Sequence, residues 1–472
     1  MAFRRARTGT SRPVLLLAFA FSVMADPVSS VAYAIEAALR ALDGDLTLLL
    51  PTMGLVVAII ALVITNYSQL VGRFPEGGGA AAASGTAFGE AWAFVPIGAL
   101  VVDFVLTIAI SVSAAASAAI AFVPDLAPWR AGIALLLLLV VAGLTWFGHL
   151  GRAVFAVMTL LFVGLGAAIV TGGLRAAPVA ELPGTGGTGS MAFVAVLLAF
   201  PVAMALATGV EAPSSAIAEL EELDDDGRRR FGRITLWLTL GIVGCLTLGL
   251  TAVAVRLGIG VPDAGSTQIA DIARASVGTG GYGLFQLFTA LLLLAATSSS
   301  LQAGPGLLKA LARHPEPDGT QAGILTSWLW PTNARHVPFR AVLVFVVLAG
   351  VVVLATGGRD QVLVLFYAVA VFLSFLMGLA AMTKFSRDEG RTLSTVINGV
   401  GAGIVAFTLA VNLLRGLPLV SLVAAGSIAL TLYASWVRAG RPRGVAHAAV
   451  LRRGRDVRPA SYGSARGSAS TR

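Results

Sequence analysis

The chain has 472 residues, of which 57% are hydrophobic and only 12% are charged, with a formal net charge of +9. Soluble domains carry about 25% charged residues, so this composition leaves too little polar surface to cover a water-soluble fold of this size. The 33 Lys and Arg residues are scattered through loops and the C-terminal tail, which argues against a nucleic-acid-binding protein. A single cysteine, Cys245, excludes a disulfide within the chain and a cysteine-based metal site.

Apolar stretches long enough to cross a membrane recur along the chain, because a hydrocarbon core of about 30 Å needs about 20 apolar residues in a helix. The sequence therefore predicts an all-α polytopic membrane protein. Its transmembrane domain is expected at 14–437, between a basic cytoplasmic N-terminus at 1–13 and a basic, disordered cytoplasmic tail at 438–472. The twelve stretches lie at residues 14–41, 46–71, 91–122, 131–149, 152–174, 190–220, 232–257, 282–311, 338–357, 360–383, 393–414 and 417–437.

The placement of basic residues predicts the orientation in the membrane. With the N-terminus inside and the loops alternating, cytoplasmic segments hold 26 of the 33 Lys and Arg residues and outer loops hold seven. This asymmetry follows the positive-inside rule and predicts that both termini are cytoplasmic. Arginine outnumbers lysine 31 to 2, which is typical of a GC-rich bacterial genome. We therefore expect a multi-pass protein of a bacterial inner membrane.

The first stretch begins like a signal peptide, but its apolar run continues through Leu39, which favours a transmembrane helix. Polar and helix-breaking residues interrupt it at Asp26, Pro27, Ser29 and Ser30. Tyr33 and Glu36 follow within the same stretch. With Asp26 and Glu36, this stretch contains two carboxylates. Ionisable residues inside a membrane span are functional candidates by default, because they are costly to insert.

The third stretch carries Asp103, Thr107 and Ser111 at positions i, i+4 and i+8, so their oxygens share one face of a helix. The sixth stretch is interrupted by Thr208, Gly209, Glu211 and Pro213. It is the second broken stretch, five after the first. Two broken helices at corresponding positions of two halves predict a transporter built from inverted repeats, with its binding site at the breaks.

Further oxygens lie in the eighth and tenth stretches, at Thr297, Ser298 and Ser299 and at Tyr367. Singly, such hydroxyls often serve helix packing, and a lone Tyr367 could belong to an interfacial aromatic belt. No Lys or Arg lies well inside any predicted span, so the carboxylates have no fixed cationic partner. Buried carboxylates in that situation take up protons or bind a mobile cation. No hydrolase, protease or nucleophile motif surrounds them, and the sequence predicts neither an enzyme nor a cofactor.

The chain resembles the amino acid–polyamine–organocation (APC) superfamily through the Pro-Glu-Gly-Gly-Gly loop at 75–79 and Gly-Val-Glu-Ala at 209–212. This resemblance implies a LeuT-like fold of five plus five inverted repeats with two additional helices, twelve spans in all, and broken helices 1 and 6. The similarity is greatest to the KimA/Kup-type potassium–proton symporters, through residues 26–33, Asp103 with Ser111, 208–211 and 367–375.

This resemblance implies that one set of residues lines potassium sites and that Glu211 serves proton coupling. Thr297, Ser298 and Ser299 are a candidate second cation site, because the corresponding position binds sodium in related folds. Pro27 and Ala34 depart from the pattern, and the large cytosolic domain of KimA is not expected here. The residues implied for potassium are Asp26, Tyr33, Asp103, Ser111, Thr208 and Tyr367.

The sequence thus favours a secondary transporter for proton-coupled potassium uptake, without a transition metal. A proton-coupled amino acid permease is the alternative, although Asp26 would repel a substrate carboxylate. A non-transporting membrane sensor or scaffold is the alternative from another class, although it would gain nothing from the insertion cost of the carboxylates. The expected partners are potassium and protons, or an amino acid, together with membrane lipid and no nucleic acid. Assembly into a homo-oligomer is left open.

Overall fold

The computed structural model describes residues 12–147, 152–180, 190–220, 223–315, 321–442 and 444–445. The segments 1–11 and 446–472 lie outside the described residues. The predictions of a basic cytoplasmic N-terminus and of a disordered tail therefore remain predictions.

The described part of the chain is almost entirely helical, which confirms the predicted all-α class. The long helices are α4 (Leu46–Arg73), α6 (Phe94–Phe122), α7 (Arg130–Phe147), α8 (Arg152–Gly173), α11 (Asp225–Leu257), α12 (Gln268–Leu311), α14 (Asp360–Asp388), α15 (Thr392–Leu414) and α16 (Leu419–Arg438). The shorter ones are α1 (Arg12–Val23), α2 (Ala25–Ser29), α3 (Val31–Ala41), α5 (Gly79–Phe88), α9 (Ser190–Ala203), α10 (Ala212–Ala216) and α13 (Phe339–Ala355).

Short elements join the helices at the two ends of the bundle. A two-stranded antiparallel sheet of β1 (His314–Pro315) and β2 (Gln321–Ala322) follows α12. The 3-10 helices are η1 (Glu90–Ala93), η2 (Pro124–Trp129), η3 (Met204–Ala207), η4 (Ile217–Glu219) and η5 (Ser327–Leu329).

Ten helical stretches among the described residues are long and apolar enough to cross a membrane. Each falls within or overlaps one of the twelve predicted stretches. The other two predicted stretches contain shorter apolar helices: the first is divided into α1, α2 and α3, and the ninth holds α13, which has 17 residues. The chain is therefore a multi-pass membrane protein.

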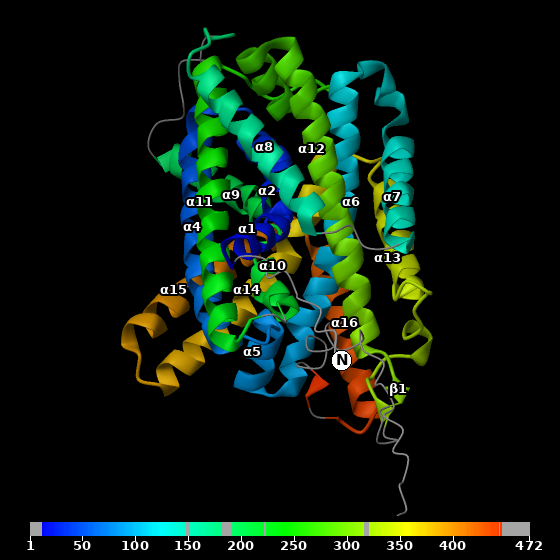
Figure 1. Cartoon of the computed structure of the whole chain (residues 1–472). Helices are drawn as coiled ribbons and strands as arrows, with labels where there is room; N and C mark the ends of the chain where they lie inside the picture. The colour runs from blue at the N-terminus through cyan, green and yellow to red at the C-terminus, as the bar shows by residue number, and fades with distance from the viewer. Residues whose placement is uncertain are drawn as a thin grey trace, which may run out of the picture.

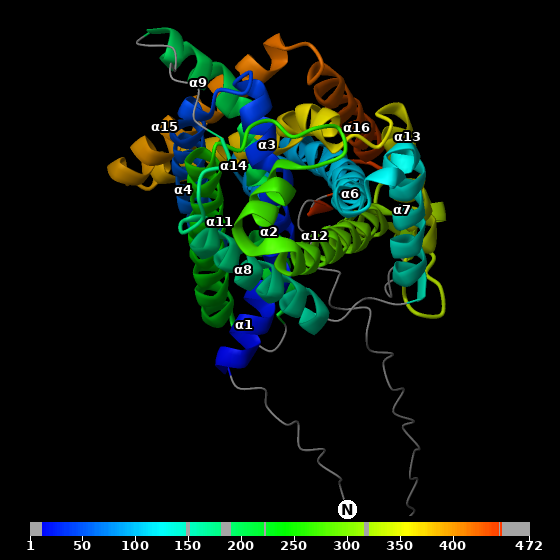
Figure 2. The same cartoon turned by 90° about the horizontal axis from the view of Figure 1, so that it is seen from above.

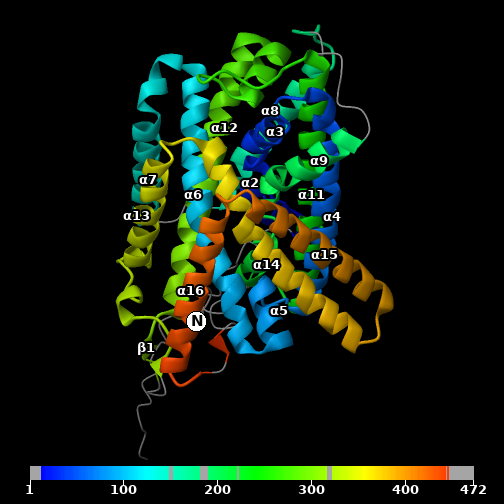
Figure 3. The same cartoon turned by 180° about the vertical axis from the view of Figure 1, so that it is seen from behind.

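The long helices run side by side through the bundle, and their connections gather at two opposite ends (Figure 1). We call these the η2 end, where α6 joins α7, and the α5 end, where α5 and β1 lie. Figure 2 shows α2 and α3 in the interior, among α6, α8, α11, α12 and α14. Figure 3 shows α15 and α16 on the outside of the bundle against α14 and α6, with which they also make contacts.

The two predicted breaks differ in kind. In the first stretch, Met24 and Ser30 separate α1, α2 and α3, but both retain backbone angles close to those of a helix (φ −79°, ψ 0° and φ −64°, ψ −22°). In the sixth stretch the chain leaves the helix: Thr208 is extended (φ −51°, ψ 131°) and Gly209 is left-handed (φ 70°). Glycine tolerates this conformation because it has no Cβ. We call the first stretch, α1 to α3, helix 1, and the sixth stretch, α9 with η3 and α10, helix 6; the latter is distinct from α6. The break in helix 1 is therefore a distortion, whereas the break in helix 6 interrupts the helix.

Candidate functional site

The two breaks meet at Asp26 and Gly209. A methyl group in place of the Gly209 hydrogen would lie 2.7 Å from Oδ2 of Asp26 and 2.9 Å from Cδ of Pro27. Only glycine allows this approach, since real Cβ atoms do not come so near another heavy atom. The left-handed turn of helix 6 therefore places backbone directly against the carboxylate of helix 1.

A second contact between the breaks involves Tyr33 of α3, seven residues after Asp26. The Tyr33 hydroxyl donates to Oγ1 of Thr208 at 3.4 Å, and the Thr208 hydroxyl in turn donates to the Ala205 carbonyl at 2.6 Å. Ser30 also crosses between the two segments, because its hydroxyl lies 3.1 Å from the Leu206 carbonyl. Tyr33 and Thr208 are both buried. Helices 1 and 6 are thus held together by side-chain hydroxyls as well as by close backbone approach.

Asp103 of α6 and Tyr367 of α14 complete the group. The Tyr367 hydroxyl lies beside the Asp103 carboxylate, and the charges of Asp103 and Asp26 interact. Both side chains are buried, with Asp103 7% and Tyr367 0% exposed. The structure thus brings together residues from four separate stretches. We call them the oxygen cluster: Asp26, Tyr33, Asp103, Thr208 and Tyr367.

Several oxygens of this cluster are buried without a hydrogen-bond partner. They are Oδ1 of Asp26, Oδ1 of Asp103 and the Tyr367 hydroxyl, which lies beside Asp103 but not in the geometry of a normal hydrogen bond. A buried oxygen without a partner loses its hydration without compensation. None of the described Lys or Arg residues pairs with Asp26, Asp103 or Glu211. The cluster therefore has oxygen ligands and two carboxyl groups without a fixed cationic partner, and either a cation or a proton would satisfy them.

Ser111 lies apart from Asp103 on α6. It lies eight residues beyond Asp103 on α6, which corresponds to about 12 Å along the helix axis. Its hydroxyl is buried and has no hydrogen-bond partner, and the same is true of Thr107, which lies between the two. A potassium site at Ser111 therefore stays a prediction, about two turns from Asp103 along the same face of α6.

Glu211 follows the break in helix 6 and is bound by two hydroxyls. Tyr67 of α4 donates to its Oε2 at 2.8 Å, and Ser374 of α14 donates to the same oxygen at 2.7 Å. Both donors are buried, and the negative charge of Asp103 also interacts with that of Glu211. Neither Tyr67 nor Ser374 was predicted as a site residue, although Ser374 falls within the 367–375 motif. Tyr67 is an ordinary hydroxyl in an apolar helix, and nothing in its own stretch marks it.

A family model described as amino acid permease matches residues 14–445, which covers nearly the whole described chain. The chain belongs to this family, within the APC superfamily. The potassium transporter KimA of Bacillus subtilis (strain 168) is 28% identical to it over 374 residues, 76% of this chain and 59% of KimA. The chain thus spans less than two thirds of the length of that relative. The family match identifies a membrane transporter but does not identify its substrate.

In this permease, Glu36 is bound by two hydrogen-bond donors that were not predicted from the sequence. Its Oε1 accepts a 2.8 Å hydrogen bond from Arg40 one turn away, and its Oε2 accepts from the backbone N–H of Gln268 at 3.0 Å. Gln268 is the first residue of α12, and a carboxylate placed against the start of a helix satisfies a free N–H group and interacts favourably with the helix dipole. The expectation that the carboxylates of the spans have no cationic partner is therefore wrong for Glu36.

The hydroxyls proposed for a second cation site are partly occupied by local contacts. Thr297 donates to the Leu293 carbonyl at 3.0 Å, and Oγ of Ser298 accepts from Gln302 at 3.1 Å. Both contacts lie within α12, where back-bonding of Ser and Thr hydroxyls is common. A second cation site at Thr297, Ser298 and Ser299 therefore stays a prediction.

Proposed function

We propose that this permease is a proton-coupled potassium importer whose cation binds at the oxygen cluster. The observation that carries the proposal is the convergence of unpartnered buried oxygens with two carboxylates that no described Lys or Arg neutralises. Alkali cations prefer carboxylate, hydroxyl and carbonyl oxygens, which replace their hydration shell. The printed name of KimA, a potassium transporter, supports the same substrate.

An amino acid is the alternative substrate, because the matching family is described as amino acid permease. Such a substrate brings its own carboxylate, which needs positive charge or free N–H groups at the break. Here Asp26 lies directly against the turn at Gly209, so a substrate carboxylate bound there would face a negative charge. This repulsion favours a cation over an amino acid. A non-transporting scaffold is disfavoured for another reason, because it would gain nothing from the cost of burying Asp26 and Asp103 in the membrane.

Glu211 is our candidate for proton coupling. It lies next to the break in helix 6, it is near enough to Asp103 for their charges to interact, and its two hydroxyl donors stabilise the ionised form. Binding of a cation at the cluster and binding of a proton at Glu211 would therefore both reduce the same excess of negative charge. Entry of one positive charge would also gain about 2.3 kcal/mol per 100 mV of inside-negative potential.

The overall architecture that we propose is the LeuT-like one, with twelve spans, two inverted repeats of five helices and two additional helices. The two breaks lie five predicted stretches apart, as such repeats require. We further propose that the α5 end faces the cytoplasm of a bacterial cell and the η2 end faces outward. The positive-inside rule supports this orientation, since 26 of the 33 Lys and Arg residues lie in segments assigned to the inner side.

Complementation tests this proposal. A bacterium lacking its own potassium importers, and producing this permease, should grow at micromolar potassium. Asp26→Asn and Asp103→Asn should abolish growth and uptake, because each removes a negative charge from the cluster. Asp125→Asn, at an exposed position of η2, should not. Uptake of a labelled amino acid without potassium rescue would overturn the proposal in favour of the amino acid alternative.

A further inference from the structure

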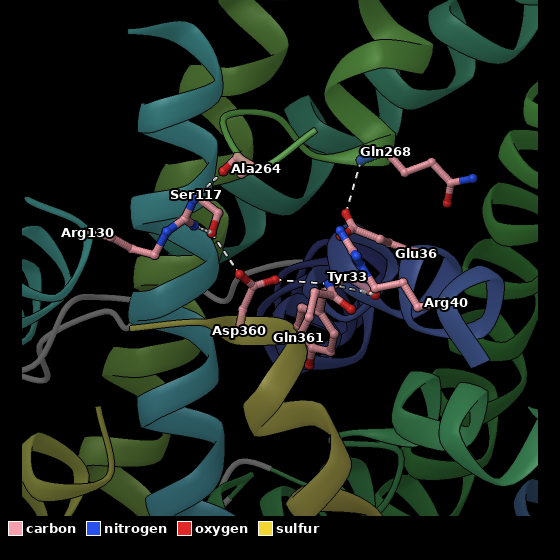
Figure 4. A network of polar contacts seen from close by, with 9 residues as sticks. All are labelled: Tyr33, Glu36, Arg40, Ser117, Arg130, Ala264, Gln268, Asp360 and Gln361. Carbon is pink, nitrogen blue, oxygen red and sulfur yellow. Dashed lines mark hydrogen bonds and ion pairs between the residues drawn. The ribbon is translucent and has the colours of Figure 1, made fainter. Parts of the chain in front are cut away.

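A continuous set of hydrogen bonds joins four elements at the η2 end (Figure 4). The guanidinium of Arg130, at the start of α7, donates to Oγ of Ser117 on α6 at 2.6 Å and to the Ala264 carbonyl at 2.9 Å. Ala264 lies in the connection between α11 and α12. Ser117 then donates to Oδ1 of Asp360, the first residue of α14, at 2.7 Å.

The other carboxylate oxygen of Asp360 connects to the oxygen cluster. The Gln361 side-chain amide donates to Oδ2 of Asp360 at 3.0 Å and to the backbone carbonyl of Tyr33 at 3.4 Å. Figure 4 shows Asp360 between Ser117 on one side and Gln361 with Tyr33 on the other. The set therefore runs without interruption from the connection at Ala264, through α7, α6 and α14, to α3.

Asp360 is the central member of this set. It is 6% exposed, and each of its oxygens accepts one of the hydrogen bonds. Hydrogen bonds to a carboxylate are about twice as strong as those between neutral groups. A carboxylate at the first residue of a helix is further stabilised by the helix dipole. Arg130 acts on Asp360 through the Ser117 hydroxyl. Removing that one hydroxyl should therefore disconnect Arg130 from Asp360 and Gln361.

We propose that Asp360 is a positioning residue that fixes Tyr33 and closes the path between the oxygen cluster and the η2 end. A cation could enter from this end only after α14 moves away from α6 and from α3. The bond of Ser117 to Asp360 resists the first movement, and the bond of Gln361 to the Tyr33 carbonyl resists the second. The role assigned to Tyr33 rests on the proposed function. The closure itself follows from the contacts and requires no particular substrate.

Thiol labelling tests the closure directly. The single native cysteine is replaced by Cys245→Ser, and a reporter is introduced as Ala37→Cys. Ala37 lies one turn beyond Tyr33 on α3, toward the η2 end, and is 3% exposed. A membrane-impermeant thiol reagent is applied to cells and, separately, to inside-out vesicles, without added potassium. The rate of labelling reports how often the η2 end opens.

Ser117→Ala should increase the labelling rate at least about tenfold from the outside, because hydrogen bonds to charged groups contribute that much to an equilibrium. Asp360→Ala should do the same. Ser117→Thr, which keeps the hydroxyl, should label at the rate of the parent. The matched control is Ser113→Ala: Ser113 lies one turn away on α6, is buried and has no hydrogen-bond partner, so its removal should leave the rate unchanged.

Three results would overturn the inference. The first is an unchanged labelling rate in both Ser117→Ala and Asp360→Ala. The second is an equal increase in Ser113→Ala, which would mean general loosening of the bundle. The third is an increase that is found only in inside-out vesicles. Because Ser117→Ala removes a single oxygen, it provides the test even where Asp360→Ala does not fold. Increased labelling in a protein that fails to take up potassium would reject the proposed substrate and leave the closure intact.

Discussion

Gly209 and Asp26 are so close that a methyl group on Gly209 would lie 2.7 Å from the carboxylate oxygen Oδ2. The two residues belong to stretches separated by about 180 positions in the chain. Their contact makes the left-handed turn of helix 6 a part of the oxygen cluster, since any side chain at this position would displace the carboxylate.

Gly209→Ala should therefore abolish uptake. The substitution adds a left-handed strain of about 1–2 kcal/mol and pushes Asp26 and Pro27 away from the break. Potassium uptake and the thermal unfolding of the purified protein measure the two effects. Gly403→Ala is the control, because Gly403 lies within α15 with no atom near the added methyl group. Wild-type uptake in Gly209→Ala would mean that the contact with Asp26 is unimportant for transport.

Tyr33→Phe should weaken potassium uptake with little loss of stability. The variant removes the hydroxyl that contacts Thr208 at 3.4 Å and keeps the ring in the core. A lost oxygen ligand should raise KM about tenfold and change kcat less. Uptake rates over a range of potassium concentrations separate the two parameters. Tyr433→Phe, on the exposed face of α16, should leave both unchanged. An unaltered KM in Tyr33→Phe would remove Tyr33 from the cluster of ligands.

Glu211→Gln should make uptake insensitive to the proton gradient. The amide is similar in shape to the carboxyl group but does not exchange a proton, so transport can no longer be coupled through this position. Potassium uptake into proteoliposomes, with and without an inward proton gradient, measures the coupling. The wild type and Asp125→Asn should respond to the gradient, and Glu211→Gln should not. A gradient response retained in Glu211→Gln would assign proton coupling to another residue.

At the α5 end, Arg73 joins the end of α4 to the end of α14 by a hydrogen bond to Oε1 of Glu389. The Arg73 guanidinium also lies 4.0 Å from the centre of the Phe385 ring. The hydrogen bond from Arg73, with smaller contributions from the charges of Arg73 and Arg391, holds the pKa of Glu389 below its ordinary value of 4.5. A carboxyl whose pKa is lowered by folding stabilises the protein above its unfolded pKa, and this stabilisation is lost as pH falls through the folded pKa.

Glu389→Gln should therefore lower the Tm at pH 7 and should make no difference well below pH 4.5. The decrease should be small, on the order of 1 °C, because exposed ion pairs contribute little. Thermal unfolding of both proteins in detergent at the two pH values measures it. Glu76→Gln, at an exposed loop position, should have no effect at either pH. A difference that persists at low pH would show that the contact acts through packing on Phe385 and not through charge.

Much of the fold could be predicted because the signal is local. A helix that crosses a membrane needs about 20 consecutive apolar residues, whatever its neighbours are. The breaks at Asp26 and at Gly209 were also visible, since proline, glycine and carboxylates stand out in apolar stretches. Their different character was not: Met24 and Ser30 keep a nearly helical backbone, whereas Thr208 and Gly209 do not.

The partners of the polar groups could not be predicted in the same way. Glu36 was read as an unpaired carboxylate, yet it accepts hydrogen bonds from Arg40 and from the start of α12. Asp360 stands at the first position of an apolar stretch, where a carboxylate is usually solvated, and it is in fact buried. Only the packing of α14 against α6 brings it to Ser117, which lies 243 positions earlier.

The sequence by itself thus determined the class of protein, the positions of the helices and the residue types available to bind a cation. These depend on the transfer of each segment from water into lipid, which is a property of that segment alone. The tertiary structure decided which oxygens converge, which carboxylates are neutralised and which contacts close the η2 end. Those outcomes depend on short distances between residues far apart in the chain, such as Tyr33 and Thr208, and such distances exist only after the helices have packed.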